Sequence, residues 1–186
     1  VSAHQRIAEN NDIITDFQTD NLMEQILHRD NLNKAYKKVK SNKGAGGIDG
    51  MSVEELLGYL RNNQEQLIQK LKDGKYKPNP VRRVEIPKET KGGFRKLGVP
   101  TVVDRVFQQA ITQVLSPIYE KQFSENSFGF RPDRGAHDAL KQCQTNVNDG
   151  YVYVVDMDLE KFFDTVCQSK LIEVLSRTIK DEVGGQ

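Results

Sequence analysis

Two aspartates follow a short apolar run, at a spacing that suits the binding of a divalent cation. The run is Tyr151 to Val155, and Asp156 and Asp158 come directly after it. Because side chains two positions apart on a strand share a face, both carboxylates would lie on one side. Hard cations such as Mg²⁺ are held by one or two carboxylates together with substrate phosphates. The spacing suggests metal-assisted phosphoryl transfer, although a strand end whose acids lie in water fits these residues equally well.

A strand and several helices must position these aspartates. The run from Tyr151 to Val155 contains only β-branched and aromatic residues, which predicts a short buried strand. Amphipathic patterns predict helices elsewhere, and the first of them is one helix or two short helices broken near Asp30 and Asn31. The expected helical ranges are 21–40, 52–73, 101–119, 136–147 and 168–180. In the last helix we expect the apolar side chains to face inward: Leu171, Ile172, Leu175 and Ile179.

Polar residues and glycine mark the ends of two of these helices. Ser52 and Glu55 have the spacing of a capping box, and Gly74 lies just past the expected end of the same helix. Thr101 is the expected N-cap of the next helix. The polar flank of that helix is expected to meet the basic hairpin formed by residues 81–99, and it consists of Asp104, Arg105, Gln108 and Gln109.

Two alternating segments around a glycine-containing turn predict a basic β-hairpin. The segments are 81–86 and 94–99, and the basic residues at or near the tip are Lys88, Lys91, Arg95 and Lys96. A mobile basic hairpin suits closure over a triphosphate. An exposed loop that charge keeps in solution is the other interpretation of the same residues.

Basic residues are concentrated in two segments, although the net charge of the 186 residues is only +1. Residues 29–43 hold six basic residues and one acid, and residues 75–105 hold nine basic residues and three acids. This asymmetry suggests a surface for a polyanion, or two solvated faces. The lysines of the first segment lie where a helix dipole favours cations, and they would equally suit phosphate.

Composition excludes several other classes of protein. A hydrophobic content of 37% with 28% charged residues is typical of a globular chain, and no apolar run is long enough to span a membrane. Cys143 and Cys167 stand alone, and with the three histidines they form no zinc-ligand spacing. We therefore expect a reducing, cytoplasmic setting. The glycine-rich segment 43–50 lacks the ending of a P-loop.

Several blocks, taken together and in order, resemble one family. The blocks are Tyr36–Gly50, Ile86–Lys88, Phe94–Thr101, Asp104–Arg105, Phe123–Pro132 and Asp158–Asp164. Their order and spacing resemble the bacterial group II intron reverse transcriptases, the intron-encoded maturases, from about residue 20 to about residue 180. The resemblance implies an α+β fold: the fingers of a right-hand polymerase with the first part of its palm, rich in helices, with a basic β-hairpin and a palm strand. Its implied ranges are a flexible lead-in (1–20), N-terminal extension and fingers (21–100), first part of the palm (101–166), and a truncated return to the fingers (167–186).

The resemblance also implies a reaction and its partners. The reaction is RNA-directed DNA synthesis, in which a primer 3′-hydroxyl attacks the α-phosphate of a dNTP with the help of two Mg²⁺ ions. The implied partners are an RNA template with a DNA primer, dNTP, and the group II intron RNA, whose splicing and mobility the protein assists. The implied setting is the bacterial cytoplasm, and exposed palm surface would allow a homodimer.

Roles follow from the resemblance residue by residue. Asp158 matches the first metal-binding, catalytic aspartate, and the carbonyl of Leu159 would join it on the metal. Phe163 matches the aromatic side chain that lies under the dNTP sugar and rejects a 2′-hydroxyl. Lys88 and Arg95 match residues that contact the triphosphate, where a mobile ammonium and a planar guanidinium fit physically. Asp156 supports the site or is structural, and the expected RNA contacts are Lys34, Lys37, Lys38, Lys40 and Arg131.

One departure from the family pattern concerns catalysis. The family carries a later pair of adjacent aspartates in its palm, and no such pair occurs among these residues. We therefore expect a fragment with little or no polymerase activity by itself. Two alternatives stay open: an RNA-binding fingers module without catalysis, and a reverse transcriptase of the retron, diversity-generating or phage-defence type.

Overall fold

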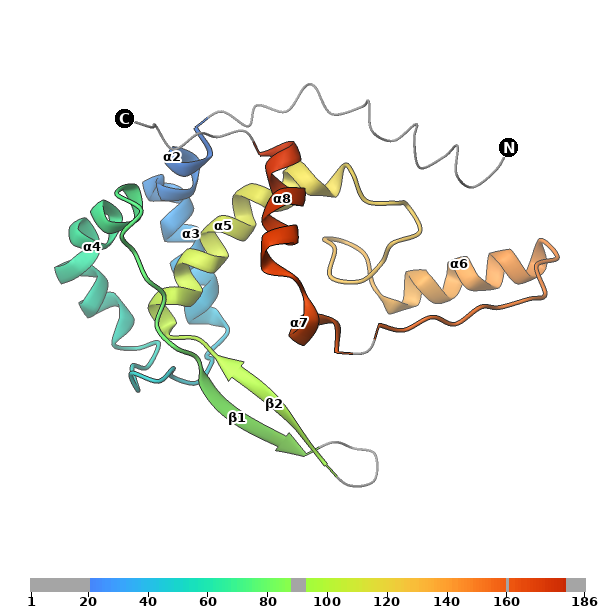
Figure 1. Ribbon diagram of the computed structural model, residues 1–186, viewed down its shortest axis with the longest axis horizontal. Helices are drawn as coiled ribbons and strands as arrows, with labels where there is room; N and C mark the ends of the chain where they lie inside the picture. Colours follow the sequence, from blue (N-terminus) through green and yellow to red (C-terminus); the bar gives the residue numbers. More distant parts are fainter. Residues whose placement is uncertain (1–20, 88–92, 160, 180–186) are drawn as a thin grey trace. The chain divides into compact units, whose positions relative to one another are not determined.

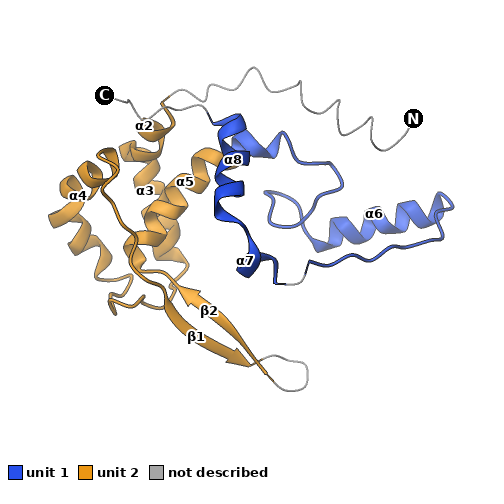
Figure 2. Cartoon of the chain, in the orientation of Figure 1, with its two compact units in different colours: residues 1–20, 117–186 blue, residues 21–116 orange. Residues whose placement is uncertain are grey.

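The chain folds into helices and one two-stranded antiparallel sheet, as far as the computed structural model describes it (Figure 1). The described residues are 21–87, 93–159 and 161–179. They divide into two compact units (Figure 2). We call Asn21–Ser116 the first unit, which Figure 2 draws in orange as unit 2, and the described residues from Pro117 onward the second unit, which it draws in blue as unit 1. No helix in the described ranges is long and apolar enough to cross a bilayer.

The first unit is built on packed helices that share a single apolar core. They are α2 (Leu22–Leu27), α3 (Arg29–Ser41), α4 (Leu56–Lys72) and the part of α5 (Val102–Glu120) that precedes Pro117. Each helix repeats apolar residues at a spacing of three or four, so that one face is buried. The buried core consists of Ala35, Val39, Val53, Leu56, Leu67, Val102, Val103, Val106, Phe107 and Ala110.

The expected range 21–40 forms two helices, and the break lies at His28, two residues before the predicted position. His28 has an extended backbone, and its Nδ1 atom accepts a hydrogen bond from the Asp30 N–H at 3.3 Å. The Asn31 amide then donates to the carbonyls of Ile26, at 2.9 Å, and Ala110, at 3.0 Å. The break is therefore held by side chains that cap α3 and tie it to α5.

The capping box that the sequence predicts at the start of α4 is confirmed. The Ser52 N–H donates to Glu55 Oε2 at 2.9 Å, and the Glu55 N–H donates to Ser52 Oγ at 3.3 Å. These bonds from Ser52 also lower the pKa of the Glu55 carboxyl. The capped segment is a turn, and α4 proper starts at Leu56. At the other end Gly74 takes a φ of +64°, which a residue with a side chain adopts only with strain.

The predicted hairpin is confirmed as β1 (Arg82–Pro87) paired with β2 (Phe94–Val99). Arg82 lies opposite Val99, and Ile86 lies opposite Arg95. The β1 side chains alternate as expected: Val84 and Ile86 are half-buried, whereas their neighbours are exposed. Figure 1 shows the two strands extending away from the helices of the same unit. Of the basic residues expected at the tip, Lys88 and Lys91 lie outside the described residues.

A buried carboxylate joins the segment before the hairpin to the first turn of α5. Asp104 is 3% exposed and accepts hydrogen bonds from the Tyr76 hydroxyl (2.6 Å), the Asn79 N–H (3.1 Å) and the Thr101 hydroxyl (2.6 Å). Thr101 Oγ1 in turn accepts from the Asp104 N–H at 3.2 Å, which confirms its predicted role as N-cap. Burial and the bond to Asp104 raise the pKa of the Tyr76 phenol.

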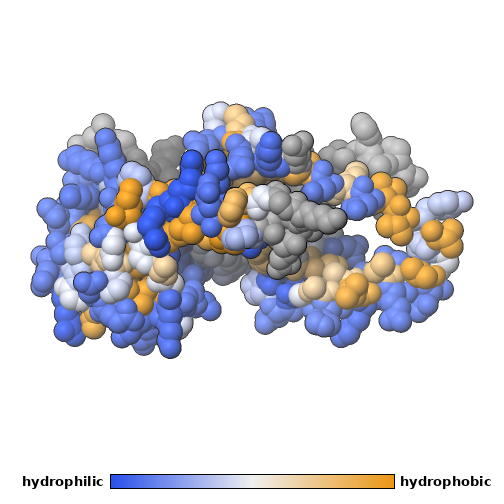
Figure 3. Space-filling view, turned by 90° about the horizontal axis from the view of Figure 1, so that it is seen from below, coloured by the Kyte–Doolittle hydropathy of each residue, from blue (hydrophilic) through white to orange (hydrophobic). Residues whose placement is uncertain are grey.

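The second unit contains α6 (Ala136–Asn148), α7 (Phe162–Thr165) and α8 (Gln168–Thr178). The predicted buried strand at Tyr151 to Val155 is wrong. Residues 151–159 belong to no helix or strand, and the side chains from Tyr151 to Val155 are 70–93% exposed. A strand requires a hydrogen-bonding neighbour, and none of the described residues pairs with this run. Figure 3 shows apolar side chains open at the surface in the part of the molecule that carries α6.

The inward-facing pattern predicted for the last helix is also wrong in part. In α8, Leu171 is 47% exposed and Ile172 is 64% exposed, whereas Leu175 is half-buried, as is Ile179 directly after the helix. The periodicity identified the helix correctly, but it does not guarantee a surface on which the apolar face can pack.

Replacement of Asp104 by alanine should lower the free energy of unfolding by about 3 kcal/mol, because it leaves buried donors without their charged acceptor. Urea denaturation of the chain measures the change. Glu65→Ala, at an exposed position of α4, is the control and should change stability by less than about 0.5 kcal/mol. Equal effects of the two substitutions would show that the Asp104 network does not hold this unit together.

Candidate functional site

The two candidate aspartates lie on an open, exposed segment of the second unit. Asp156 and Asp158 are both exposed, and Asp158 Oδ1 accepts a hydrogen bond from the Leu159 N–H at 2.9 Å. The described ranges contain no cluster of three or more histidine, cysteine or acidic side chains that would hold a metal ion. An exposed carboxylate fits one Mg²⁺ that also binds substrate phosphates. The described residues do not supply ligands for a second ion.

An exposed aromatic side chain follows the aspartates closely. Phe163 is 87% exposed in α7, and its ring meets the ring of Phe162 edge to face with 5.3 Å between the ring centres. The Thr165 hydroxyl donates to the carbonyl of Lys161 at 3.1 Å and so helps to close this short helix. The structure therefore presents Asp158 and Phe163 to solvent, five residues apart in one unit.

The nucleotide-binding residues expected on the hairpin are described only in part. Arg95 is exposed on β2 opposite Ile86, and its neighbour Lys96 lies opposite Glu85. Lys88 lies outside the described residues. Arg95 belongs to the first unit and Asp158 to the second, so each is described within its own unit.

Two arginines hold the glycine-rich loop, a role that the sequence did not indicate. Arg82 Nε donates to the Gly46 carbonyl at 3.0 Å, and Arg105 Nη2 donates to the Ala45 carbonyl at 2.6 Å. A Cβ atom on Gly47 would lie 2.6 Å from the Thr101 Cα atom. The absence of a side chain at Gly47 therefore lets the backbone of this loop lie directly against the start of α5.

The four lysines expected to contact RNA lie exposed along α3, on the side away from the buried Ala35 and Val39. They make no ion pair with an acid among the described residues. Lys40 lies over the ring of Tyr36, with its Nζ atom 5.9 Å from the ring centre. Positive charge without an internal acid partner is available to an external anion. The lysines are Lys34, Lys37, Lys38 and Lys40.

Arg131, the other expected RNA contact, lies inside its own loop. Its side chain is 5% exposed, and Arg131 Nη2 lies 2.7 Å from Glu120 Oε1. The guanidinium also donates to the carbonyls of Ser124, at 2.5 Å, and Ser127, at 2.9 Å, and it lies 5.4 Å from the ring centre of Phe123. The hydrogen bonds from Arg131 lower the pKa of Glu120. This internal role had no sequence signal, because no periodicity links the two residues; the RNA contact stays a prediction.

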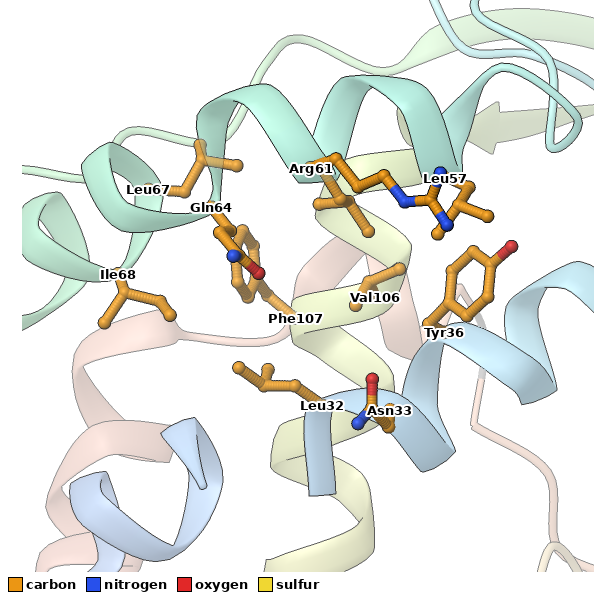
Figure 4. A pocket seen from close by; sticks show the side chains of 11 residues that line it. Leu32, Asn33, Tyr36, Leu57, Arg61, Gln64, Leu67, Ile68, Val106 and Phe107 are labelled. Atoms are coloured by element: carbon orange, nitrogen blue, oxygen red, sulfur yellow. The ribbon is translucent and has the colours of Figure 1, made fainter. Parts of the chain in front are cut away.

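An apolar cavity of about 120 Å³ lies between α3, α4 and α5. In Figure 4, Leu32, Val106 and Phe107 lie around its apolar part, and Arg61 and Gln64 supply polar groups from α4. No acid, histidine, cysteine or serine lines this cavity. We interpret it as part of the packing of α3, α4 and α5.

Comparison with known proteins identifies relatives over nearly the whole chain. Residues 86–183 match the family described as reverse transcriptase (RNA-dependent DNA polymerase). The group II intron-encoded protein LtrA of Lactococcus lactis subsp. cremoris is 36% identical over 177 residues, which cover 95% of this chain and 29% of LtrA. Protein YkfC of Escherichia coli (strain K12) is 36% identical over 166 residues, 86% of this chain and 43% of YkfC.

A more distant relative shares a shorter segment. The mitochondrial nuclear intron maturase 2 of Arabidopsis thaliana is 38% identical over 79 residues, which cover 42% of this chain and 11% of that protein. The chain thus spans less than half the length of each of these relatives.

Replacement of Arg131 by lysine should loosen the loop from residue 124 to residue 130, because an ammonium cannot reproduce the fork of donors that binds Glu120 and two carbonyls. Hydrogen exchange read by mass spectrometry should show amides of this loop exchanging about tenfold faster or more. Arg177→Lys is the matched control, since Arg177 pairs with Glu173 at an exposed site. If Arg131→Lys leaves exchange unchanged, Arg131 does not hold the loop.

Proposed function

Because the chain belongs to the reverse transcriptase (RNA-dependent DNA polymerase) family, we propose that it forms part of a group II intron RNA-directed DNA polymerase. The observation that carries the proposal is the family match over residues 86–183, a range that contains β2, α5 and the segment of Asp158. In this proposal residues 21–100 belong to the fingers of a right-hand polymerase, residues 101–166 to the palm, and residues from 167 onward to the returning fingers.

In the proposed reaction a primer 3′-hydroxyl loses its proton and attacks the α-phosphate of a dNTP, so that a phosphodiester bond forms, the bond between the α- and β-phosphates breaks and pyrophosphate leaves. The Asp158 carboxylate and the Leu159 carbonyl would hold Mg²⁺, and their exposure leaves room for phosphate oxygens beside them. When bound, the metal supplies charge stabilisation and activation of the hydroxyl, with a second ion held partly by groups beyond the described residues. Asp158 would thus supply part of the ligands of a metal site to which other groups also contribute.

The dNTP would be positioned by groups from the hairpin and from α7. Arg95 is exposed on β2 and would bind the triphosphate with its planar fork, together with Lys88. The ring of Phe163 would pack under the sugar. The side chain of Phe163 is 87% exposed, so the sugar can reach the ring. An aromatic ring at that position leaves no space for a 2′-hydroxyl.

Intron RNA would bind the lysine face of α3. Each exposed lysine that neutralises a phosphate releases a counterion, so affinity would fall as salt rises. Relatives named as an intron-encoded protein and an intron maturase support a role in splicing and mobility of the intron. The two free, exposed cysteines fit the reducing cytoplasm of a bacterium.

An RNA-binding module without catalysis is the second candidate. The observation in its favour is that the described residues offer one exposed lysine face but no complete metal cluster. The exposed run from Tyr151 to Val155 would in that case be covered by a second copy of the chain, since an extended run of this composition readily pairs. Synthesis that depends on Asp158 separates the two candidates.

Asp158→Asn should abolish DNA synthesis in a protein that carries this chain together with the family's later pair of aspartates. Even outer groups around a metal are worth about 10–100-fold in activity, so loss of a direct ligand should lower the rate by more than about 100-fold. Primer extension on an RNA template measures the rate. Asp149→Asn, at an exposed position of the same unit, is the matched control and should retain most activity. If Asp158→Asn is as active as this control, Asp158 is not the metal ligand.

Phe163→Val in the same protein should relax the choice of sugar, because a smaller side chain makes room for a 2′-hydroxyl. The ratio of kcat/KM for dNTP to that for rNTP should fall by about tenfold or more, which corresponds to the loss of roughly 1.4 kcal/mol of discrimination. Phe162→Val is the control. An unchanged ratio in Phe163→Val would remove Phe163 from the nucleotide site.

A further inference from the structure

We propose that the first unit carries a separate nucleotide-binding pocket, which takes one nucleotide of single-stranded RNA. The pocket has a volume of about 470 Å³, within the range of small-ligand sites. It is formed by α4, from Tyr59 in its first turn to Lys70 in its last, by the segment that follows α4, by the end of the glycine-rich loop and by the start of α5. None of its lining residues has a role in the proposed polymerase site.

Three lysines line this pocket and make it positive. Lys70 and Lys77 make no ion pair with an acid among the described residues, and Lys75 lies 3.3 Å from Asp73. Asp49 is the one acid in the lining, and its Oδ1 atom already accepts from the Met51 N–H at 3.2 Å. Lysine ammonium groups bind phosphate as point charges, so the rim suits an anion with a phosphate group.

Two tyrosines give the pocket an aromatic wall. Tyr76 is fixed, because its hydroxyl binds Asp104 and its ring packs edge to face on Phe107 with 5.1 Å between ring centres. Tyr59 is 37% exposed, so its ring is open to a ligand. A nucleobase stacks on such a ring with little dependence on sequence. Phosphate-binding lysines beside an aromatic wall match the two chemical parts of a nucleotide.

The floor of the pocket is rigid and polar groups stand at its edge. Thr101 is fully buried and Val103 is 6% exposed, both in the part of the fold that the Asp104 network holds. Asn79 also lines the pocket, where its side-chain amide is available to a ribose hydroxyl. A rigid site of this kind binds without the cost of ordering itself. That the nucleotide in this pocket belongs to an RNA rests on the proposed function. A free nucleotide has the same phosphate, sugar and base as a nucleotide of the RNA.

Binding of a labelled single-stranded RNA of about ten nucleotides tests the pocket. Lys70→Gln should lower affinity and reduce the slope of log affinity against log salt by about one. Lys72→Gln is the matched control: Lys72 is exposed in the same last turn of α4 but does not line the pocket. Equal losses in the two variants would overturn the proposal, because they would show that charge alone draws the RNA.

Substitutions of Tyr59 test the pocket without changing the charge of the protein. Tyr59→Ala should weaken RNA binding by roughly fivefold or more, and Tyr59→Phe should bind as the parent does, because stacking needs only the ring. Circular dichroism checks that both variants fold. Unchanged affinity in Tyr59→Ala would overturn the proposal.

Free AMP distinguishes the two sources of the nucleotide. We expect AMP to compete only weakly with the RNA, because it lacks the neighbouring phosphates. AMP that binds as tightly as the RNA and loses this binding in Tyr59→Ala would overturn the RNA occupant. All of these readouts are of binding, so a failure of the pocket is distinct from a failure of DNA synthesis in Asp158→Asn.

Discussion

The buried carboxylate of Asp104 is the interaction on which the first unit depends. A carboxylate that is 3% exposed is costly unless donors replace its water. Its donors come from two places in the chain, Tyr76 and Asn79 before the hairpin and Thr101 at the start of α5. They meet only when the segment before β1 docks on α5. That docking sets the base of the hairpin and one wall of the lysine-lined pocket.

Local patterns predicted much of this fold. The helices and the hairpin follow from periodicity and from turn residues, and the Ser52 capping box follows from spacing alone. The predicted strand at Tyr151 to Val155 is wrong because composition indicates only the tendency to form a strand. A strand also needs a hydrogen-bonding neighbour, which the described residues do not provide for this run. The break at His28 depended on a cap from a histidine side chain, which no spacing rule signals.

Some residues of the candidate site could also be predicted from the sequence, and others could not. Asp158, Phe163 and Arg95 came from the resemblance, and the structure shows each of them exposed. The resemblance implies an RNA contact for Arg131, and the sequence places Asp104 on a polar helix flank, yet both side chains are nearly buried and hydrogen-bonded within the fold. Sequence reasoning cannot separate a charge that meets a ligand from one that meets the protein, because the partners come from positions with no fixed spacing.

The first unit is held by its buried network, whereas the segment of Asp158 lies open. Hydrogen exchange of the 186-residue chain, read by mass spectrometry, compares the two regions within one molecule. We predict that amides of residues 102–110 in α5 exchange orders of magnitude more slowly than those of residues 151–159, which should exchange like an unstructured peptide. Protection of residues 151–159 to the level of α5 would show that the segment of Asp158 is not open.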